Sequence, residues 1–441
     1  MCKNASFFQT ALCNIIDEMN EYPWLFSKNP QSDFSRNSKL GFKKALSIIL
    51  SFGNKSLPNE LLDYFHCAKD VPSTSAFVQC REKILPEALI FLFHEFNSRC
   101  DYKPTYRGYR LLAIDGSELQ IATNPEHKES YLVTKDNRKP YNLLHLNAMY
   151  DLMSHMYIDA ILQGKNEANE QRALADMVDH SDIPTAIVLA DRGYESYNCF
   201  AHIQERGWKF LFRVKDGTGG IASGLDLPDA EEFDISFELK LTRKQTNAMK
   251  ELLKDRNKYK RLKSYHDFDY LPAKNRKHEE TKIYPLRIRV VRFKLNDESI
   301  ETIITNLDGD DFPSDEIKAL YAKRWGIETS FRKLKYTIGL LHFHAKKVEY
   351  IYQEIFARMI IYNFTELVIS HVVMEKKDRK HAYQANFSTA VHICRQYFRG
   401  NVSPPDVETL IARLILPIRP GRSLPRNLAP RKAASFYYRV A

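Results

Sequence analysis

Three acidic residues are spaced so that they could hold divalent cations together. Asp115 ends the apolar run 110–115, and Asp191 ends the apolar run 185–191. Both runs are typical of buried central strands, and ligands collect at the carboxyl edge of such strands. Glu328 follows on a predicted helix. Three carboxylates with few histidines nearby form an all-oxygen site that suits Mg²⁺ or Mn²⁺, and two such ions can support phosphoryl transfer.

The segment from Ser314 to Gly339 is predicted to be the helix that carries Glu328. Pro313 and Ser314 provide a start with a hydroxyl N-cap, and Gly339 is a suitable stop. At about 100° per residue, charged and aromatic residues share one face, namely Tyr321, Arg324, Trp325, Glu328, Arg332 and Lys335. The adjoining face is apolar and would pack on a core: Leu320, Ile327, Phe331 and Leu334. Taken alone, the charged face could equally be solvated surface in which Glu328 pairs with Arg324 or Arg332.

The elements around the first two acids predict an α/β sheet. From Arg110 onwards we predict a strand, a hairpin, a helix, a strand, a helix and a strand, at 110–115, 141–150 with 156–162, 166–180, 185–191, 194–206 and 208–214. Three more strands are predicted between Asp191 and Glu328, at 233–241, 284–293 and 300–306. The stretch 241–282 within that region is strongly basic, which indicates either a solvated loop or a surface that grips phosphates.

The first hundred residues read as helices separated by proline and glycine breaks. Apolar positions recur at three- and four-residue spacing in five segments: 5–19, 40–52, 59–65, 75–84 and 87–96. These helices could bind DNA or serve packing or dimerisation, and the residues do not distinguish the two. A long apolar helix is predicted at 348–371, and the tail after residue 411 is basic with no acidic residue.

Composition narrows the class of protein. The 441 residues are 44% hydrophobic and 12% aromatic, which fits a globular chain of several domains. A net charge of +10 suits a polyanionic partner. The seven scattered cysteines favour reduced thiols over disulfides or a zinc site. We expect no membrane span and no signal peptide.

These residues together resemble a known family. Tyr321, Arg324, Glu328 and Lys335 match, without a gap, the Tyr-x2-Arg-x3-Glu-x6-Lys signature of a group of DDE transposases from insertion sequences that excise DNA through hairpin ends. Asp115 in A-I-D-G-S and Asp191 in L-A-D-R-G-Y match the first two acidic positions. The segment P-I-R-P-G-R-S-L-P-R at 417–426 is also similar to that family's C-terminal region. The resemblance covers residues 75–430.

The resemblance implies an α/β fold with an RNase H-like catalytic core. A mainly β insertion interrupts the core, an all-helical N-terminal domain precedes it and a helical C-terminal region follows. The expected boundaries are 1–100, 101–216, 217–306, 307–375 and 376–441. Asp115, Asp191 and Glu328 would be catalytic and hold two Mg²⁺ ions, for which Mn²⁺ can substitute. DNA-binding residues would be Tyr321, Arg324, Trp325, Arg332, Lys333 and Lys335.

The implied activity is cut-and-paste transposition: nicking, hairpin formation and opening, and strand transfer at terminal inverted repeats. The partners would be double-stranded DNA, as transposon ends and target, and a second copy of the chain in a synaptic homodimer. The implied location is the cytoplasm, at the nucleoid. The alternatives are an RNase H-like nuclease or resolvase without strand transfer, and a domesticated DNA-binding protein that does not cut.

One departure from the family concerns base capture. Relatives commonly keep a tryptophan in the insertion that stacks on a flipped base, whereas this chain has only Trp24, Trp208 and Trp325. Other candidates for that role are Phe268, Tyr270 and Tyr284.

Overall fold

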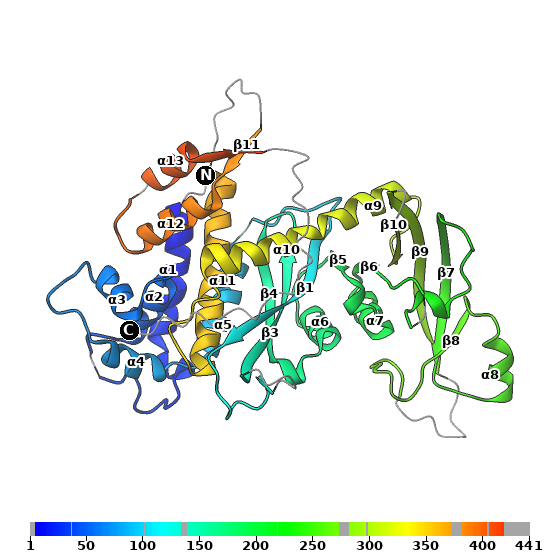
Figure 1. Cartoon of the computed structure of the whole chain (residues 1–441), viewed down its shortest axis with the longest axis horizontal. Helices are drawn as coiled ribbons and strands as arrows, with labels where there is room; N and C mark the ends of the chain where they lie inside the picture. Colours follow the sequence, from blue (N-terminus) through cyan, green and yellow to red (C-terminus); the bar gives the residue numbers. More distant parts are fainter. Residues whose placement is uncertain are drawn as a thin grey trace.

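A computed structural model of the chain describes residues 5–36, 38–100, 102–133, 139–217, 219–272, 282–296, 299–372, 382–403 and 405–418. The molecule has a helical end and a sheet that extends from its middle to the opposite end (Figure 1). A chain of helical segments, α9 and α10, crosses from the sheet end to the helical end. No helix in those residues is long and apolar enough to cross a membrane.

The N-terminal helices form where the periodicity predicts them. They are α1 (Ala5–Glu21), α2 (Phe42–Ser51), α3 (Leu57–Tyr64), α4 (Thr74–Glu82) and α5 (Glu87–Arg99), with the 3-10 turn η1 (Pro23–Phe26) after α1. Local chemistry fixes some of their starts, because the Ser73 hydroxyl accepts a hydrogen bond from the Ala76 amide and caps α4. Their apolar faces join one core with the helix α11 (Val348–His371), which confirms the helix predicted at 348–371.

The central strands are β1 (Arg110–Ile121), β2 (Tyr131–Leu132), β3 (Tyr141–Asp151), β4 (Met156–Gly164), β5 (Ala186–Ala190) and β6 (Lys209–Arg213). Five of them lie in the order β4-β3-β1-β5-β6. The hairpin β3–β4 is antiparallel, as is β1 with β3, whereas β1, β5 and β6 run parallel. The helices α6 (Glu170–Asp179) and α7 (Tyr197–Glu205) and the 3-10 turns η2 (Lys165–Glu167) and η3 (Arg192–Tyr194) complete this part.

The two faces of β1 belong to different cores, because successive side chains of a strand point to opposite faces. Leu111 and Ala113 join the core formed with the N-terminal helices and α11. Leu112 and Ile114 join the core formed with α6 and α7. The alternation therefore places Asp115 on the face of Leu111 and Ala113.

The segment 217–306, predicted to be an insertion, continues this sheet. Its elements are η4 (Ala222–Gly224), β7 (Phe233–Thr242), α8 (Asn247–Leu252), β8 (Tyr259–Arg261), β9 (Tyr284–Asn296) and β10 (Ser299–Thr305). The three strands predicted there are confirmed as β7, β9 and β10. Strand β10 pairs antiparallel with β6, so one ten-stranded sheet spans both parts. Much of the basic stretch 241–282 is described, but residues 273–281 lie outside the described part.

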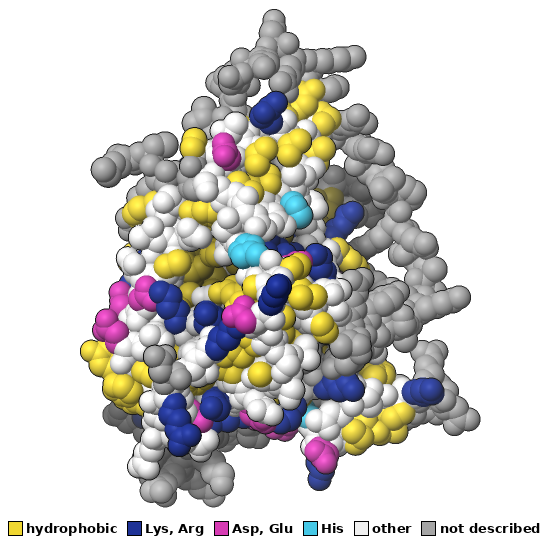
Figure 2. Space-filling model, turned by 90° about the vertical axis from the view of Figure 1, so that its left-hand side faces the viewer, with side chains coloured by type: hydrophobic (Ala, Val, Ile, Leu, Met, Phe, Trp, Pro, Cys, Tyr) yellow, Lys and Arg dark blue, Asp and Glu magenta, His cyan; other side chains and the backbone are white. Residues whose placement is uncertain are grey.

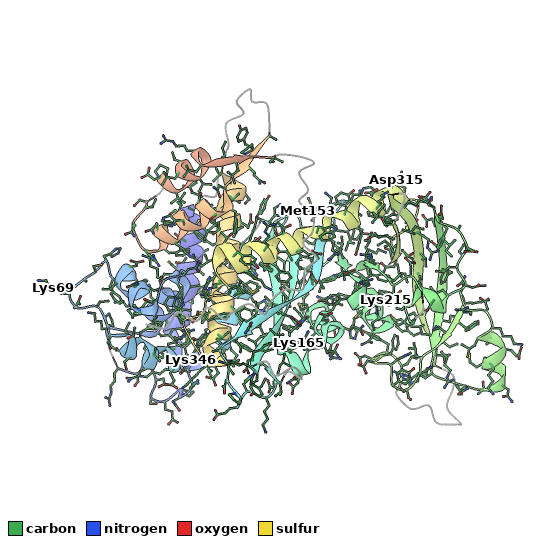
Figure 3. All side chains as sticks on the ribbon, in the orientation of Figure 1. Lys69, Met153, Lys165, Lys215, Asp315 and Lys346 are labelled. Carbon is green, nitrogen blue, oxygen red and sulfur yellow. The ribbon has the colours of Figure 1, made fainter. Side chains whose placement is uncertain are left out.

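The segment predicted as one helix is divided into three pieces: α9 (Ser314–Lys323), α10 (Trp325–Arg332) and the π-helix η5 (Lys333–Ile338). Gly339 ends it with a φ of 92°, which confirms the predicted stop. The predicted hydroxyl N-cap is wrong. Pro313 is the N-cap, and the Ser314 hydroxyl instead donates to Asp234 at 2.6 Å. Figure 3 places Asp315, at the start of α9, beside the strands of the insertion.

The C-terminal region contains β11 (Tyr383–Ala385), α12 (Phe387–Phe398), α13 (Asp406–Arg413) and β12 (Ile415–Pro417). Helix α12 packs on α11. The predicted basic tail lies mostly outside the described part, which ends at residue 418.

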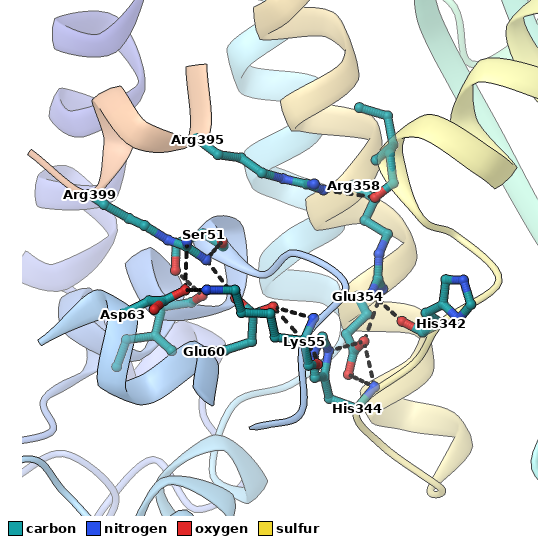
Figure 4. A network of polar contacts seen from close by, with 12 residues as sticks. Ser51, Lys55, Glu60, Asp63, His342, His344, Glu354, Arg358, Arg395 and Arg399 are labelled. Carbon is teal, nitrogen blue, oxygen red and sulfur yellow. Dashed lines mark hydrogen bonds and ion pairs between the residues drawn. The ribbon is translucent and has the colours of Figure 1, made fainter. Parts of the chain in front are cut away.

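A buried ion network ties the N-terminal helices to α11 and α12 (Figure 4). Arg81 of α4 and Arg358 of α11 each lie 2.9 Å from the Glu354 carboxylate. Arg399 at the end of α12 lies 2.5 Å from Glu60 of α3. All five side chains are buried. Because buried pairs break only at high energetic cost, these helices are fixed to the rest of the chain.

Candidate active site

The first two acids lie side by side at one edge of the sheet. In the parallel pair β1–β5, the last partners are Ile114 and Ala190, and Asp115 and Asp191 are the next residues of each strand. The expectation that Asp115 ends a strand is wrong, because β1 continues to Ile121 along β3. Asp115 nevertheless lies where the parallel pairing stops, so the two carboxylates meet at this edge.

Each aspartate is ordered by its own backbone. Asp115 Oδ1 accepts a hydrogen bond from the Gly116 amide at 2.8 Å, and Asp191 Oδ1 accepts one from the Arg192 amide at 2.8 Å. The pKa of Asp115 is raised to about 6, chiefly by burial and in part by the Glu328 and Asp191 carboxylates, against the lowering effects of the Gly116 hydrogen bond and Arg324. The carboxylates of Asp115, Asp191 and Glu328 thus lie near one another where Asp115 is largely shielded from water.

Glu328 reaches the same edge from α10, which packs against β1. Ile327 and Phe331 of α10 lie in the core that contains Leu111 and Ala113, on the face assigned to Asp115. A Cβ at Gly326 would lie 2.7 Å from Leu152 Cδ2, so a larger residue there would require the end of the Leu152 side chain to move. The three predicted acids are therefore brought to one edge of β1 and β5.

The predicted charged face of the helix is only partly exposed. Tyr321 and Arg324 are buried, at 4% and 2% exposure, whereas Trp325 is 50% exposed. The Arg324 guanidinium lies 5.6 Å from the Tyr321 ring centroid and 5.3 Å from that of Trp325. It also donates to Glu328 at 3.0 Å. Burial raises the pKa of the Tyr321 hydroxyl. The apolar face is buried as predicted.

The basic residues that follow have different surroundings. Lys335 donates to the carbonyl of Glu118 at 2.8 Å, on the same strand as Asp115. Lys333 pairs with Glu366 of α11 at 2.8 Å and lies 4.4 Å from the Phe387 ring centroid. Arg332 is exposed.

Phe268, Tyr270 and Tyr284, the aromatic residues predicted as candidates for base capture, pack in or against a hydrophobic core. Phe268 and Tyr284 are buried, with ring centroids 5.3 Å apart, and Tyr270 lies 5.5 Å from Tyr284. All three join the core formed with α7. Trp325, one helical turn before Glu328, is half-exposed, whereas Phe268 and Tyr284 are buried.

Sequence reasoning missed a buried acid near the site. Glu301 of β10 is buried and lies 3.3 Å from Arg213 of β6. Burial raises its pKa, while Arg213 and Arg324 lower it and Asp191 raises it. The pairing of β6 with β10 brings Glu301 near Asp191 and Arg324, and no local sequence pattern predicts that pairing.

The donor set fits a hard divalent cation by its chemistry. In the part of the chain that is described, no three His, Cys, Asp or Glu side chains lie close enough to ligate an ion as they stand. Glu328 is paired with Arg324, and both aspartates accept backbone hydrogen bonds. All three groups are carboxylates, however, which are the oxygen ligands that a hard divalent cation prefers.

The described side chains at the helical end are mixed in charge on the face that Figure 2 shows. The helical end is seen face-on in Figure 2, where Lys and Arg side chains are interspersed with acidic and hydrophobic ones.

Comparisons with known proteins place the chain in a family. Residues 106–364 match the family model of the transposase DDE domain. The chain is 21% identical over 379 residues to the transposase for insertion sequence element IS1151 of Clostridium perfringens, covering 78% of this chain and 73% of that protein. A cryo-EM structure of the piggyBac transposase synaptic complex with hairpin DNA aligns at 11% identity, covering 96% of this chain and 87% of that one. Its TM-score of 0.45 is too low for any conclusion about this chain.

Proposed function

This chain belongs to the DDE transposases, metal-dependent enzymes that cleave and join DNA, and we propose that it moves an insertion sequence by a cut-and-paste route. The observation that carries the proposal is the adjacency of Asp115 and Asp191 after the last parallel partners of β1 and β5. The packing of α10 against β1, which brings Glu328 to the same edge, supports it.

We assign the catalytic core to the RNase H-like class. The order β4-β3-β1-β5-β6, with an antiparallel β1–β3–β4 unit and parallel β5 and β6, supports this assignment. The core then comprises residues 101–216 and 307–375, with 217–306 as the insertion.

Asp115, Asp191 and Glu328 would hold two Mg²⁺ ions, or Mn²⁺ in their place. When bound, the ions would activate the attacking oxygen and stabilise the leaving oxygen during phosphoryl transfer. Arg324 holds the Glu328 carboxylate at 3.0 Å and so orients it. The pKa of Asp115, raised chiefly by burial, is typical of carboxylates at functional sites.

The signature Tyr321, Arg324, Glu328 and Lys335 favours the hairpin-forming group. In that route a nick frees a 3′-hydroxyl, which attacks the opposite strand and displaces its phosphodiester oxygen to form a hairpin. Water then opens the hairpin, and the restored 3′-hydroxyl attacks target DNA. Nicking and hairpin opening are hydrolyses, in which the oxygen of water replaces the 3′-oxygen on phosphorus and a 3′-hydroxyl leaves. Hairpin formation and strand transfer exchange one phosphoester bond for another, so no step needs a covalent link to the protein.

DNA contacts are assigned to the exposed part of the catalytic helix. Arg332 and Lys335 would contact phosphates, and Trp325 would stack on a base. Lys333 would need to leave Glu366 before it could bind DNA. Tyr321 and Arg324 would act from their buried positions, by shaping the surface under the terminal strand. The basic stretch 241–282 would add further phosphate contacts.

The chain would act in the cytoplasm, at the nucleoid, as a homodimer that holds two transposon ends together. Light scattering of the complex with end DNA tests this assembly. A complex of one protein with one end that completes hairpin formation would contradict an obligatory dimer.

A plasmid carrying the DNA that flanks the gene tests the reaction. In Mg²⁺ the chain should excise the segment and join it to target DNA. Asp115→Ala, Asp191→Ala and Glu328→Ala should each abolish cleavage with little loss of DNA binding. Cut but unjoined products would instead identify a nuclease or resolvase, and untouched DNA a domesticated binding protein. Substantial cleavage by any one variant would remove that residue from the site.

A further inference from the structure

A fourth acid lies at the edge of the sheet that carries Asp115 and Asp191. Glu170 is the first residue of α6, on the face of the sheet opposite the one assigned to Asp115. Its carboxylate lies between the two catalytic segments. A Cβ built on Gly116 would lie 2.9 Å from Glu170 Oε1, and one built on Gly193 would lie 3.1 Å from Oε2. One oxygen therefore lies against the residue after Asp115, and the other against a residue two positions after Asp191.

The partner of Glu170 is a buried histidine. His145 of β3 is 4% exposed, and its Nε2 lies 3.0 Å from Glu170 Oε1. Among the described residues, neither ring nitrogen of His145 has a well-aligned hydrogen bond. A Cβ on Gly116 would lie 2.5 Å from Nε2, which backbone or ring could not accommodate. Gly116 is thus the residue that lets the histidine reach Glu170.

A second unpartnered polar group lies in the same place. Tyr194 is buried, and its hydroxyl has no hydrogen-bond partner within the described part of the chain. The charges of Glu170 and Asp115 both act on this hydroxyl, so it lies near the two acids.

We propose that Glu170, held by His145, is a fourth carboxylate of the catalytic edge that positions the Asp115 and Asp191 segments and adds negative charge for their divalent cations. This inference rests on the proposed function. Glu170 is a positioning residue, because it acts through the backbone at Gly116 and Gly193 and through its field. A second layer of this kind orients ligands, and its loss commonly lowers metal affinity about 10-fold or more.

Glu170→Gln tests the proposal because it removes the charge and keeps the shape. Mn²⁺ should bind the full-length variant about 10-fold more weakly than the wild type, as measured by electron paramagnetic resonance of free Mn²⁺. The Mg²⁺ concentration needed for half-maximal plasmid cleavage should rise by the same factor, and cleavage at saturating Mg²⁺ should be largely restored. Glu167→Gln, an exposed acid three residues earlier, is the matched control and should change neither value.

The outcomes separate this inference from the proposed function. Wild-type Mn²⁺ affinity in a folded Glu170→Gln protein would overturn it, even if Asp115→Ala abolishes both Mn²⁺ binding and cleavage. Cleavage that survives Asp115→Ala would overturn the proposed function instead. If Glu170→Gln does not fold, Glu170→Asp decides, since it keeps the charge but withdraws it by one methylene. An intermediate loss of Mn²⁺ affinity would support the proposal, and an unchanged affinity would refute it.

Discussion

The guanidinium of Arg324 lies 3.0 Å from the carboxylate of Glu328, one helical turn away, and is itself 2% exposed. A buried cation next to a catalytic acid can hold that acid in one orientation without touching DNA.

Arg324→Ala should lower stability as well as activity. It leaves Glu328 without its charged donor, a loss of about 2 kcal/mol, and it empties the space between the Tyr321 and Trp325 rings. Urea unfolding and plasmid cleavage measure the two effects. Arg332→Ala is the matched control, since Arg332 is exposed: it should weaken DNA binding with no measurable loss of stability. If Arg324→Ala unfolds at the same urea concentration as the wild type, the buried Arg324 side chain contributes little to the free energy of unfolding.

Lys335→Ala should flatten the salt dependence of DNA binding. One lost phosphate contact lowers the slope of log affinity against log salt by about 0.9. The slope is measured by titrating labelled duplex DNA at several salt concentrations. Lys69→Ala removes an exposed lysine at the far helical end, labelled in Figure 3, and should leave the slope unchanged. Equal slopes for Lys335→Ala and wild type would assign Lys335 to the Glu118 contact alone.

Glu354→Ala should strongly destabilise the chain. It leaves Arg81 and Arg358 buried without their acid, and breaking such a network costs about 3–5 kcal/mol. Thermal unfolding measures the loss. Lys347→Ala breaks an exposed pair with Glu82 at the start of the same helix and should have little effect. A small effect of Glu354→Ala would mean that the N-terminal helices are held by apolar packing alone.

His180→Gln should reduce stability more in mild acid than in mild base. The hydrogen bond of His180 Nε2 with Asp159, 2.7 Å long, raises the pKa of His180, with help from Asp176 and Asp179. A raised folded pKa stabilises fully below the ordinary value, about 6.5, and the contribution disappears as pH rises through the folded pKa. Unfolding at about pH 5.5 and about pH 8 measures it. An equal loss of stability at both pH values would contradict the raised pKa of His180. Burial lowers the pKa of the neighbouring His94, so its own contribution to stability would depend on pH in the opposite direction.

Much of the site followed from the sequence because its parts are local. The apolar runs before Asp115 and Asp191 specify neighbouring strands, and parallel neighbours bring their following residues together. The face of the helix that carries Ile327 and Phe331 follows from a 3.6-residue period. These signals need only a few consecutive residues, so no knowledge of the fold is required.

The remaining features depend on contacts between distant segments. Periodicity shows that Tyr321 and Arg324 share a face with Glu328, but not that α9 lies against β6 and β9, which covers part of that face. Glu301 enters the site only through the pairing of β10 with β6. Glu170 reads as an ordinary acid in a first helical turn, where the helix dipole favours it. Its proposed role depends on the space that Gly116 and Gly193, which lack side chains, leave for its carboxylate.

The pairing of β10 with β6 also limits how this protein can be modified. A segment that lies between two proposed catalytic residues could be taken for one that can be deleted without harm to the rest of the fold. Here, excision of 217–306 would remove β10, the neighbour of β6, and expose a row of unpaired amides and carbonyls along Leu211, Phe212 and Arg213. Bare edges of this kind template aggregation. A shortened variant would therefore need a substitute edge strand, whereas a partner domain fused at the α8 tip would leave the sheet intact.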